Sequence, residues 1–441
     1  MEKQALKIRG GVRVPHFKDT AESGCIKMPA PPVLVLPMQQ HIGVTCSSTV
    51  SVGEKIAVGQ VIGDTDSLVS APIHAPASGK VKAILPYVLP NGLTIDAIHI
   101  ETDGQNNFCS SVRKPGIKTS EDFIRAIRQS GVVGLGGAGF PTHVKLTMKQ
   151  GVKIDTLIIN GAECEPYITA DYLEIMENYT NILNGIERVK KYIGINKCII
   201  GIESNKPKAI ALLTEKIVLR SMQGYASVVE LPALYPYGAE KMLIRAVTGR
   251  IVPLGGLPCD VGTIVINIST ISVLNNYLDT GIPLIQKRIT LAGRALANPQ
   301  NILVPIGTPI QDVIDFSGGF KEEPFKIIKG GPMMGIAQQD FSTPILKHDN
   351  AILCLTAKET YIPEALPCIR CGRCVQTCPM RLMPTFIERN VNRKNAKMLA
   401  KLNVSGCLEC GSCAYVCPSK RPLIEYIRKG KQIEKVVNKN D

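Results

Sequence analysis

The sequence predicts a multidomain α/β protein built from four modules. Three observations lead to this fold class. Strand-like and helix-like segments alternate between residues 113 and 288, short β segments with glycine turns fill residues 33–100, and eight of the fifteen cysteines gather beyond residue 367. Alternating strands and helices indicate a mostly parallel sheet. A chain of 441 residues is long enough for roughly two to four domains.

Residues 1–110 are predicted to form the first module, a barrel sandwich. The stretch VSVGEKIAVGQVIGDTDSLVSAPIHAPASGKVKAI has short β-rich segments with repeated glycine turns. It resembles biotinyl and lipoyl domains, but the hairpin that carries a lysine in those domains has none here, so we expect a structural copy. Cys46 is expected to be a buried thiol. His41 and His74 have no metal-ligand spacing.

The second module, residues 113–288, is predicted to be an α/β domain. The segment TSEDFIRAIRQSG at 119–131 has helical apolar spacing, a cap at Thr119 or Ser120, and a glycine stop. Strands are expected at IDTLIIN and KCIIGIE, and helices at KPKAIALLTEKI and GAEKMLIRAVTG. The most apolar stretch, VGTIVINISTISVL, is too short to span a membrane and is predicted to be a strand followed by a helix.

The third and fourth modules follow at residues 289–345 and 360–430. The third has glycine and proline turns with one amphipathic helix, IQDVIDF, and resembles a small β-grasp domain; its glycine turn GGPMMGIAQ is assigned no chemistry. The fourth holds two cysteine repeats and is expected to be a ferredoxin-like helical domain. One or two helices are expected between the repeats.

The two repeats share the pattern C-x-x-C-x-x-C-x-x-x-C-P. They read CIRCGRCVQTCP and CLECGSCAYVCP and begin 39 residues apart. This is the bacterial ferredoxin signature for a 4Fe–4S cluster, in which the fourth cysteine ligates the other cluster. The pattern therefore predicts two clusters. One is held by Cys368, Cys371, Cys374 and Cys417, and the other by Cys407, Cys410, Cys413 and Cys378.

Zinc and disulfides are the alternatives for these cysteines. Pairs of C-x-x-C also bind zinc, but zinc sites need neither the third and fourth cysteines at this spacing nor the prolines at 379 and 418. Disulfides are disfavoured without an export signal, and the opening MEKQALKIRG is polar and charged. We expect a cytoplasmic protein, either free or peripherally bound at the cytoplasmic face of the cell membrane.

The net charge of +14 is concentrated beside the cysteines. Residues 368–441 hold fifteen Lys or Arg against five Asp or Glu, a local charge of +10. Cations there offset anionic, thiolate-bound clusters and suit an acidic partner. Nucleic-acid binding is not expected, because aromatic residues make up only 5% of the chain and there is no Trp for base stacking.

The segment GVVGLGGAGFPTHVKL at 131–146 contains a literal G-x-G-x-x-G pattern. A Rossmann turn needs a strand before the glycines and a helix after them. Here a predicted helix precedes the glycines and a strand follows at 154–160, so the match to a Rossmann turn is misleading. The glycine-rich backbone is still suited to bind a phosphate through its N–H groups.

Four segments resemble the flavoprotein subunit of respiratory complex I. They are GVVGLGGAGFPTHVKL, which resembles its flavin and NADH loop, and NGAECEPY, YPYGAEKMLIRAVTGR and VINIST. With the two ferredoxin motifs appended, nearly the whole chain resembles the RnfC family, whose members belong to the Rnf electron-transport complex. The resemblance implies a complex-I-type flavin domain at 113–288, FMN as a cofactor, and NADH as the electron donor.

The resemblance also implies that the glycine-rich loop cradles the flavin phosphate and the dinucleotide. Phe140 would stack on an NADH ring. No catalytic acid or base is implied, because the protein's task is to align nicotinamide and flavin. The cradle residues would be Gly134, Gly136, Gly137, Gly139 and Lys145.

The other three segments would complete the pocket. NGAECEPY would place Asn160 and Glu163 beside the flavin and Glu165 near the nicotinamide. YPYGAEKMLIRAVTGR would close the pocket over the flavin, and VINIST would contact its phosphate end. The residues of these last two segments are Tyr235, Gly238, Glu240, Asn267 and Thr270.

Three positions depart from the family pattern. Ala162 stands in the place of an aspartate, Ala239 in the place of a glutamate, and Leu135 in the place of an arginine. Each departure removes a polar contact. The role of Cys164, which lies between the two glutamates of NGAECEPY, stays open.

Three functions remain open at this point. In the first, the chain oxidises NADH through FMN and passes electrons singly through both clusters to an Rnf-type membrane complex. In the second, it supplies a cytosolic reductase such as proline reductase, because the opening LKIRGGVRVPHFKDTA departs from the Rnf pattern. In the third, the clusters relay electrons without an NADH site, as the changes at Ala162 and Ala239 allow.

Overall fold

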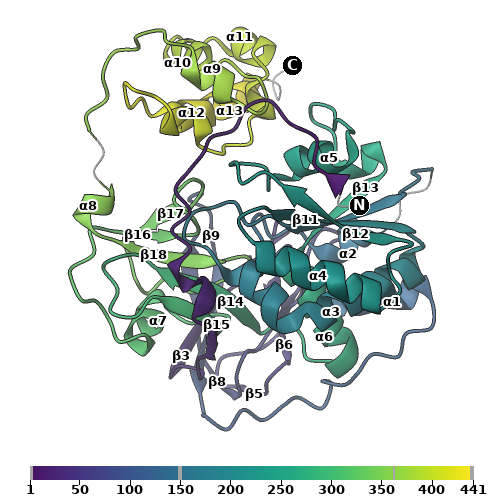
Figure 1. Cartoon of the computed structure of the whole chain (residues 1–441). Coiled ribbons are helices and arrows are strands. Elements are labelled where there is room, and N and C mark those ends of the chain that lie inside the picture. The colour runs from purple at the N-terminus through teal and green to yellow at the C-terminus, as the bar shows by residue number, and fades with distance from the viewer. Residues whose placement is uncertain (1–2, 148–150, 361–362, 438–441) are drawn as a thin grey trace.

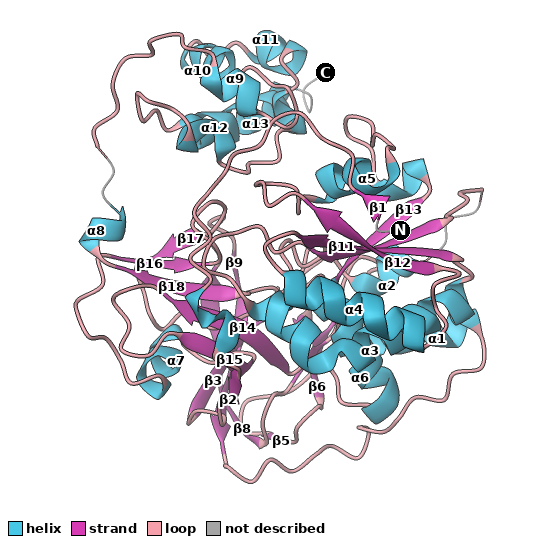
Figure 2. Ribbon diagram, viewed as in Figure 1, coloured by secondary structure: helices cyan, strands magenta, loops and turns pink. Residues whose placement is uncertain are grey.

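The computed structural model describes residues 3–147, 151–360 and 363–437. Within these residues it contains four β-sheets and a C-terminal helical domain (Figure 1). Helices and strands are mixed throughout the larger part of the molecule (Figure 2). The predicted fold class, a multidomain α/β protein, is confirmed. Each helix in the described part of the chain is too short or too polar to cross a membrane.

Two small sheets form the barrel-sandwich module. One has the strand order β3-β9-β8-β5 and the other β4-β6-β7. Leu34, Ile62 and Ile98 are fully buried in the core between them. This confirms the predicted module. Its strands are β3 (Val33–Pro37), β4 (Ser47–Ser48), β5 (Lys55–Ile56), β6 (Val61–Asp64), β7 (Ile73–His74), β8 (Gly79–Val88) and β9 (Thr94–Thr102).

The central domain is a parallel sheet in the order β1-β12-β11-β10-β13. Strand β10 (Thr156–Gly161) is apolar on both faces, as is typical of a parallel strand covered on both sides. Leu157 and Ile159 pack with α3, α4 and α6, whereas Ile158 packs with α5. The other elements are β1 (Lys3–Gln4), β11 (Lys197–Glu203), β12 (Ala226–Leu231), β13 (Thr263–Asn267), α3 (Ala170–Ile193), α4 (Pro207–Leu219), α5 (Glu240–Thr248) and α6 (Ile268–Thr280).

A mixed six-stranded sheet has the order β17-β16-β18-β14-β15-β2 and packs against α7 (Ile310–Phe316). It contains the predicted β-grasp module, and we call it the β-grasp sheet. It is larger than predicted, because β18 lies beyond residue 345 and β2 comes from the start of the chain. The strands are β2 (Cys25–Lys27), β14 (Gln286–Ala292), β15 (Gln300–Pro305), β16 (Lys326–Lys329), β17 (Ile336–Gln338) and β18 (Ala351–Leu355).

The C-terminal domain is helical, as predicted, and it lies at one end of the molecule (Figure 1). Ile387, Leu399 and Ile427 form its small apolar core. Two helices, α10 and α11, separate the cysteine motifs. The helices are α8 (Ala357–Thr360), which precedes the domain, α9 (Arg373–Thr377), α10 (Pro384–Asn392), α11 (Ala396–Lys401), α12 (Ser412–Tyr415) and α13 (Leu423–Val437).

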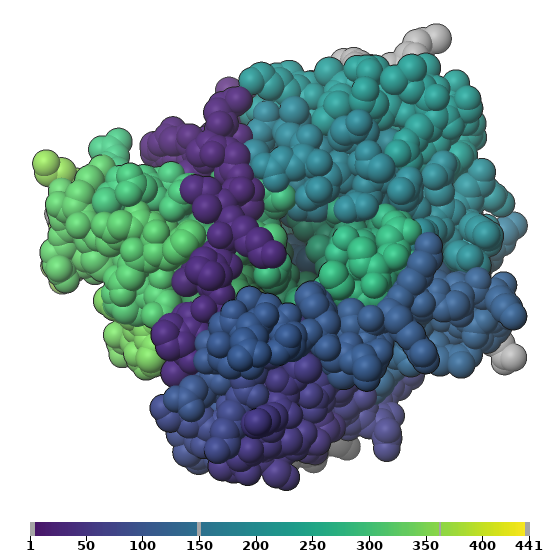
Figure 3. All heavy atoms as spheres, turned by 90° about the horizontal axis from the view of Figure 1, so that it is seen from below, coloured from purple at the N-terminus to yellow at the C-terminus, as the bar shows by residue number. Residues whose placement is uncertain are grey.

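The N-terminal segment, residues 3–27, joins three parts of the molecule instead of entering the barrel sandwich. β1 extends the central sheet and β2 extends the β-grasp sheet. Between them, the Gly11 N–H donates to the Thr377 carbonyl at 2.8 Å, and the Thr377 hydroxyl donates to the Gly11 carbonyl at 2.8 Å. Figure 3 shows the segment running along the seam between the central domain and the β-grasp sheet. The first 110 residues therefore divide differently from the predicted module.

Candidate functional site

The glycine-rich loop, residues 131–140, connects α1 (Ser120–Gln129) to α2 (Thr142–Leu146). Helix α1 begins as predicted, with the Thr119 hydroxyl accepting a hydrogen bond from the Asp122 N–H. The loop is closed by the Gly134 N–H, which donates to the Phe140 carbonyl at 2.9 Å. Because β10 follows the loop, the helix-before and strand-after order predicted from the sequence is confirmed, and the loop is not a Rossmann turn.

The exposed part of this loop presents backbone N–H groups. In the described structure, no acceptor is bonded to the N–H groups of Gly136, Gly137 or Gly139. Gly136 and Gly137 are exposed, and an added Cβ at Gly137 would meet no atom within 4 Å. Free N–H groups on a small-residue turn form a cradle for a phosphate. The loop therefore fits the phosphate of a flavin.

Asn267 and Thr270 lie beside this cradle at the start of α6. The Asn267 side chain caps α6, since its oxygen accepts a hydrogen bond from the Thr270 N–H at 3.1 Å. Its amide group donates to Asp171 at 2.7 Å, and the Thr270 hydroxyl accepts from the Leu135 N–H at 2.9 Å. An added Cβ at Gly136 would lie 2.5 Å from the Asn267 Nδ2 atom. The structure thus brings together the residues predicted for the phosphate end.

Leu135, where the family pattern has an arginine, has a structural role here. Its side chain is 1% exposed and packs with the barrel-sandwich core. Ala162, in place of an aspartate, is also buried, and it packs with Tyr237 beneath the central sheet. Both departures replace polar groups by buried apolar contacts.

The turn after β10 packs on the turn before α5. The Asn160 side-chain amide donates to the Gly238 carbonyl at 2.8 Å, and its oxygen accepts from the Ala162 N–H at 3.2 Å. Glycine at 238 permits this approach, because an added Cβ would lie 3.1 Å from the Cys164 sulfur. Asn160 and Gly238, predicted from different segments, are therefore neighbours.

Lys145 and Glu240 form an ion pair at 2.9 Å. Lys145 also donates to the Val265 carbonyl at 3.1 Å. Their side chains are 28% and 38% exposed. Lys145, which was predicted to bind a phosphate, is thus held beside β13 by Glu240, which was also predicted to line the pocket.

Glu163 contacts the first turn of α3. Its carboxylate accepts hydrogen bonds from the N–H groups of Asp171 at 2.7 Å and Tyr172 at 3.3 Å, where the helix end favours negative charge. Burial raises the pKa of Glu163 to about 7, and nearby Lys18 opposes the rise. Lys18 donates to the Glu163 carbonyl at 3.0 Å. The place of Glu163 beside a flavin stays a prediction.

Glu165 contacts the turn at 330–335, to which the sequence analysis assigned no chemistry. One carboxylate oxygen accepts from the Met333 N–H at 3.0 Å, and the other is buried without a partner in the described structure. Burial raises the pKa of Glu165 to about 7. Tyr235 is also buried, and its hydroxyl likewise has no partner among the described residues. Burial, then the charges of Glu165, Cys164 and Cys410, raise the pKa of Tyr235.

The cysteines group across the two motifs. Burial and then the neighbouring Cys407, Cys410 and Cys378 raise the pKa of Cys413, and burial with a contribution from Cys417 raises the pKa of Cys374. The fourth cysteine of each motif therefore lies near the other motif. No three His, Cys, Asp or Glu side chains in the described ranges stand close enough to hold one metal ion.

One cysteine group faces the central domain. Cys410 is buried in a cluster with Val12 and Tyr235. An added Cβ at Gly411 would lie 2.9 Å from the Met333 carbonyl oxygen. By contrast, Cys368 and Cys371 of the other group are exposed. The second cysteine motif therefore packs against the central domain, and the start of the first motif is exposed to solvent.

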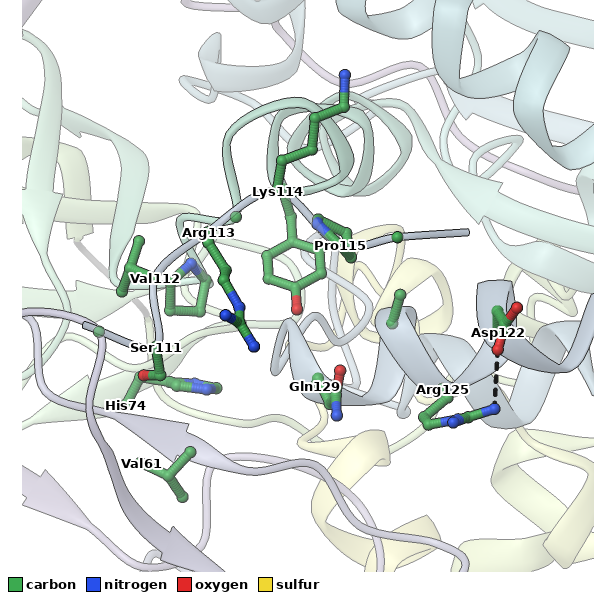
Figure 4. A pocket seen from close by; sticks show the side chains of 16 residues that line it. Val61, His74, Ser111, Val112, Arg113, Lys114, Pro115, Asp122, Arg125 and Gln129 are labelled. Carbon is green, nitrogen blue, oxygen red and sulfur yellow. Dashed lines mark hydrogen bonds and ion pairs between the residues drawn. The ribbon is translucent and has the colours of Figure 1, made fainter. Parts of the chain in front are cut away.

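A separate cavity of about 430 Å³ lies between the barrel sandwich and the central domain (Figure 4). His74 and Val61 line it from one side and Arg113 and Gln129 from the other. Arg125 at its rim pairs with Asp122. None of the residues 134–139 lines this cavity, so it is not part of the candidate site.

Family comparisons agree with this division of the chain. A family described as "Nuo51 FMN-binding domain" matches residues 127–276, and "RnfC Barrel sandwich hybrid domain" matches residues 6–105. "SLBB domain" matches residues 288–337, and "4Fe-4S dicluster domain" matches residues 367–420. The chain therefore carries an FMN-binding domain and a domain for two 4Fe–4S clusters.

Among solved structures, the NAD+-reducing [NiFe]-hydrogenase in the H2-reduced state is similar in fold. The TM-score is 0.51 at 15% identity, over 72% of this chain and 61% of that chain. Curated relatives are much more similar in sequence. The chain is 45% identical to the C subunit of the proton-translocating ferredoxin:NAD(+) oxidoreductase complex of Clostridium ljungdahlii, over 95% of this chain and 92% of the relative. It is 40% identical to the C subunit of the Na(+)-translocating ferredoxin:NAD(+) oxidoreductase complex of Acetobacterium woodii, over 96% of each. The chain belongs to the RnfC family.

Proposed function

We propose that this protein is an NADH-oxidising electron-transfer subunit that binds FMN at the glycine-rich loop. It passes electrons one at a time through two 4Fe–4S clusters to a partner. The observation that carries the proposal is one turn that bridges the central domain and the C-terminal domain. The turn at 330–335 contacts Glu165 in the central domain and Gly411 in the C-terminal domain.

The residues of the loop fit FMN. The free N–H groups of Gly136 and Gly137 face solvent and would hold the phosphate, with Asn267 and Thr270 beside them. When bound, FMN supplies the conversion between a two-electron hydride donor and one-electron clusters. Asn160 holds the turn at Gly238 beside the turn after β10, so residues from both turns would line the flavin site.

The two clusters take different places in the route. We assign Cys378, Cys407, Cys410 and Cys413 to an inner cluster, because Cys410 packs with Tyr235 of the central domain. We assign Cys368, Cys371, Cys374 and Cys417 to an outer cluster, because Cys368 and Cys371 are exposed. Electrons leaving the flavin would therefore reach the second motif's cysteines before the first motif's.

The electron partner is proposed to be another subunit of a membrane complex. The relatives named above are subunits of ion-translocating ferredoxin:NAD+ oxidoreductase complexes. This favours peripheral attachment to such a complex over the alternative predicted from the sequence, a soluble reductase such as proline reductase. The excess of Lys and Arg in residues 368–441 suits an acidic docking face on that partner.

The test is a visible spectrum of anaerobically purified protein before and after NADH, with acid-released flavin quantified. We expect roughly one FMN per chain and loss of both flavin and cluster absorbance on adding NADH. Protein that contains iron and sulfide but takes up no FMN, and does not respond to NADH, would instead be a cluster-only relay.

A further inference from the structure

Three backbone carbonyl groups of the glycine-rich loop accept hydrogen bonds from distant parts of the chain. The Nζ atom of Lys287 donates to the Leu135 carbonyl at 3.0 Å. The Nζ atom of Lys347 donates to the Gly131 carbonyl at 2.8 Å. The N–H of Ile42, from the barrel sandwich, donates to the Gly139 carbonyl at 3.2 Å. Three carbonyls of the loop are therefore bonded by residues that are distant from it in the sequence.

The two lysines are deeply buried. Lys287 is 3% exposed and Lys347 is 1% exposed. Burial lowers the pKa of Lys287, and it lowers the pKa of Lys347 to about 8. Within the described residues, neither ammonium group is within 4.0 Å of a carboxylate oxygen. Burying a cation without a paired anion costs folding free energy, which suggests that these two lysines have a functional role.

Both lysines come from outside the central domain. Lys287 lies on β14 of the β-grasp sheet, and Lys347 lies in the segment that leads into β18. The Leu135 carbonyl that Lys287 bonds belongs to the same peptide unit as the free Gly136 N–H, and in a trans peptide the two groups point in opposite directions. Lys347 bonds the carbonyl of Gly131, at the start of the loop. Residues on or next to the β-grasp sheet thus stabilise a loop that belongs to the central domain.

We propose that Lys287 and Lys347 are positioning residues for a phosphate group bound by the glycine-rich loop. Lys287 holds the carbonyl opposite the Gly136 N–H and so orients that N–H toward the ligand, Lys347 fixes the start of the loop, and both positive charges attract an anion to the loop. This inference rests on the proposed function, in which the phosphate belongs to FMN. It adds that the β-grasp sheet sets the preference for the phosphorylated flavin.

The proposal is tested by comparing FMN with riboflavin, which lacks the phosphate. The full-length protein is purified anaerobically, stripped of flavin, and titrated with each compound while the fluorescence of free flavin is followed. In Lys287→Met we expect FMN to bind about ten-fold more weakly, as for loss of one charge-assisted interaction. Riboflavin binding is expected to stay unchanged, so the preference for FMN shrinks by the same factor.

Arg288→Met is the matched control. Arg288 is the next residue on β14, its side chain is 10% exposed, and it pairs with Glu174 at 3.1 Å and Glu177 at 2.7 Å. Removing it destabilises the same strand without touching the loop. We expect it to leave the ratio of FMN to riboflavin affinity unchanged. If Lys287→Met does not fold, Lys347→Gln applies the same test from the other lysine.

Two results would overturn the inference. One is an equal loss of FMN and riboflavin affinity in the lysine variants, since a merely structural role weakens both. The other is unchanged affinity for both. Either result leaves the proposed function intact as long as the unmodified protein binds FMN. Unmodified protein that binds no FMN overturns the proposed function and this inference together.

Discussion

The Nζ atom of Lys145 lies 2.9 Å from the Oε2 atom of Glu240, so two residues predicted to line one pocket neutralise each other across 95 positions of sequence. The pair is partly exposed, and such pairs contribute about 0.2–1 kcal/mol to stability. We expect the ion pair to affect the binding of an anionic ligand more than it affects stability. Lys145→Met should weaken FMN binding several-fold, whereas Glu240→Gln should leave it unchanged or strengthen it.

This prediction is measured by FMN titration at low and high salt. The difference between the two variants should shrink as salt rises, because salt screens exposed charges. Equal losses of FMN affinity in both variants would contradict this prediction, because they would mean that FMN binding depends on the intact ion pair and not on the charge of Lys145.

A second prediction concerns the space at Gly136. An alanine there places its Cβ 2.5 Å from the Asn267 Nδ2 atom and must displace the side chain that caps α6. Overpacking of this kind costs about 1–3 kcal/mol. We expect Gly136→Ala to lower FMN affinity by about ten-fold or more. Gly224→Ala, in the turn before β12, is the control, because its Cβ would meet nothing within 4 Å and it lies outside the cradle. If both variants bind FMN equally well, Asn267 does not shape the cradle.

A third prediction follows from the inner and outer placement of the cysteines. In Cys410→Ser the inner cluster is lost, and NADH should no longer reduce the remaining cluster rapidly. In Cys371→Ser the outer cluster is lost, and NADH should still reduce the inner one. Low-temperature electron paramagnetic resonance after rapid mixing distinguishes the two, and dithionite serves as the control because it reduces any cluster present. Equally fast reduction by NADH in both variants contradicts this order.

A fourth prediction concerns pH. Burial raises the pKa of Glu165 to about 7 from a usual value of 4.5, so the folded state binds this proton more tightly than the unfolded state. The stability from this group is fully present below pH 4.5 and is lost as pH rises through 7. The loss is at most roughly 3 kcal/mol.

Glu165→Gln should therefore flatten the decline of the melting temperature between pH 5 and 8, and the variant should be the more stable protein at pH 8. The residual slope is expected from Glu163, whose pKa burial also raises to about 7. Glu215→Gln, on the exposed face of α4, is the control and should follow the unmodified protein. A Glu165→Gln profile parallel to that of the unmodified protein would contradict the assignment.

The parts of this fold that the sequence predicts are those governed by local chemistry. The cap at Thr119 acts over three residues, and the cysteine motifs act over about a dozen, so both are visible in short segments. The residues that complete the candidate site, by contrast, contact partners that are distant in the sequence. Asp171 meets Asn267 across 96 positions, and Lys287 and Lys347 meet the glycine-rich loop across 152 and 216 positions. No local pattern marks these residues, because strand order alone brings them together.

The N-terminal segment has a consequence for how the protein is made. Lys3 pairs with Val229, Cys25 pairs with Asn301, and Gly11 bonds to Thr377. During synthesis, these N-terminal residues leave the ribosome before their partners, which are translated hundreds of residues later. The tie between Gly11 and Thr377 closes only after the first cysteine motif has been translated. Docking of the C-terminal domain onto the N-terminal segment is thus a late event in biogenesis.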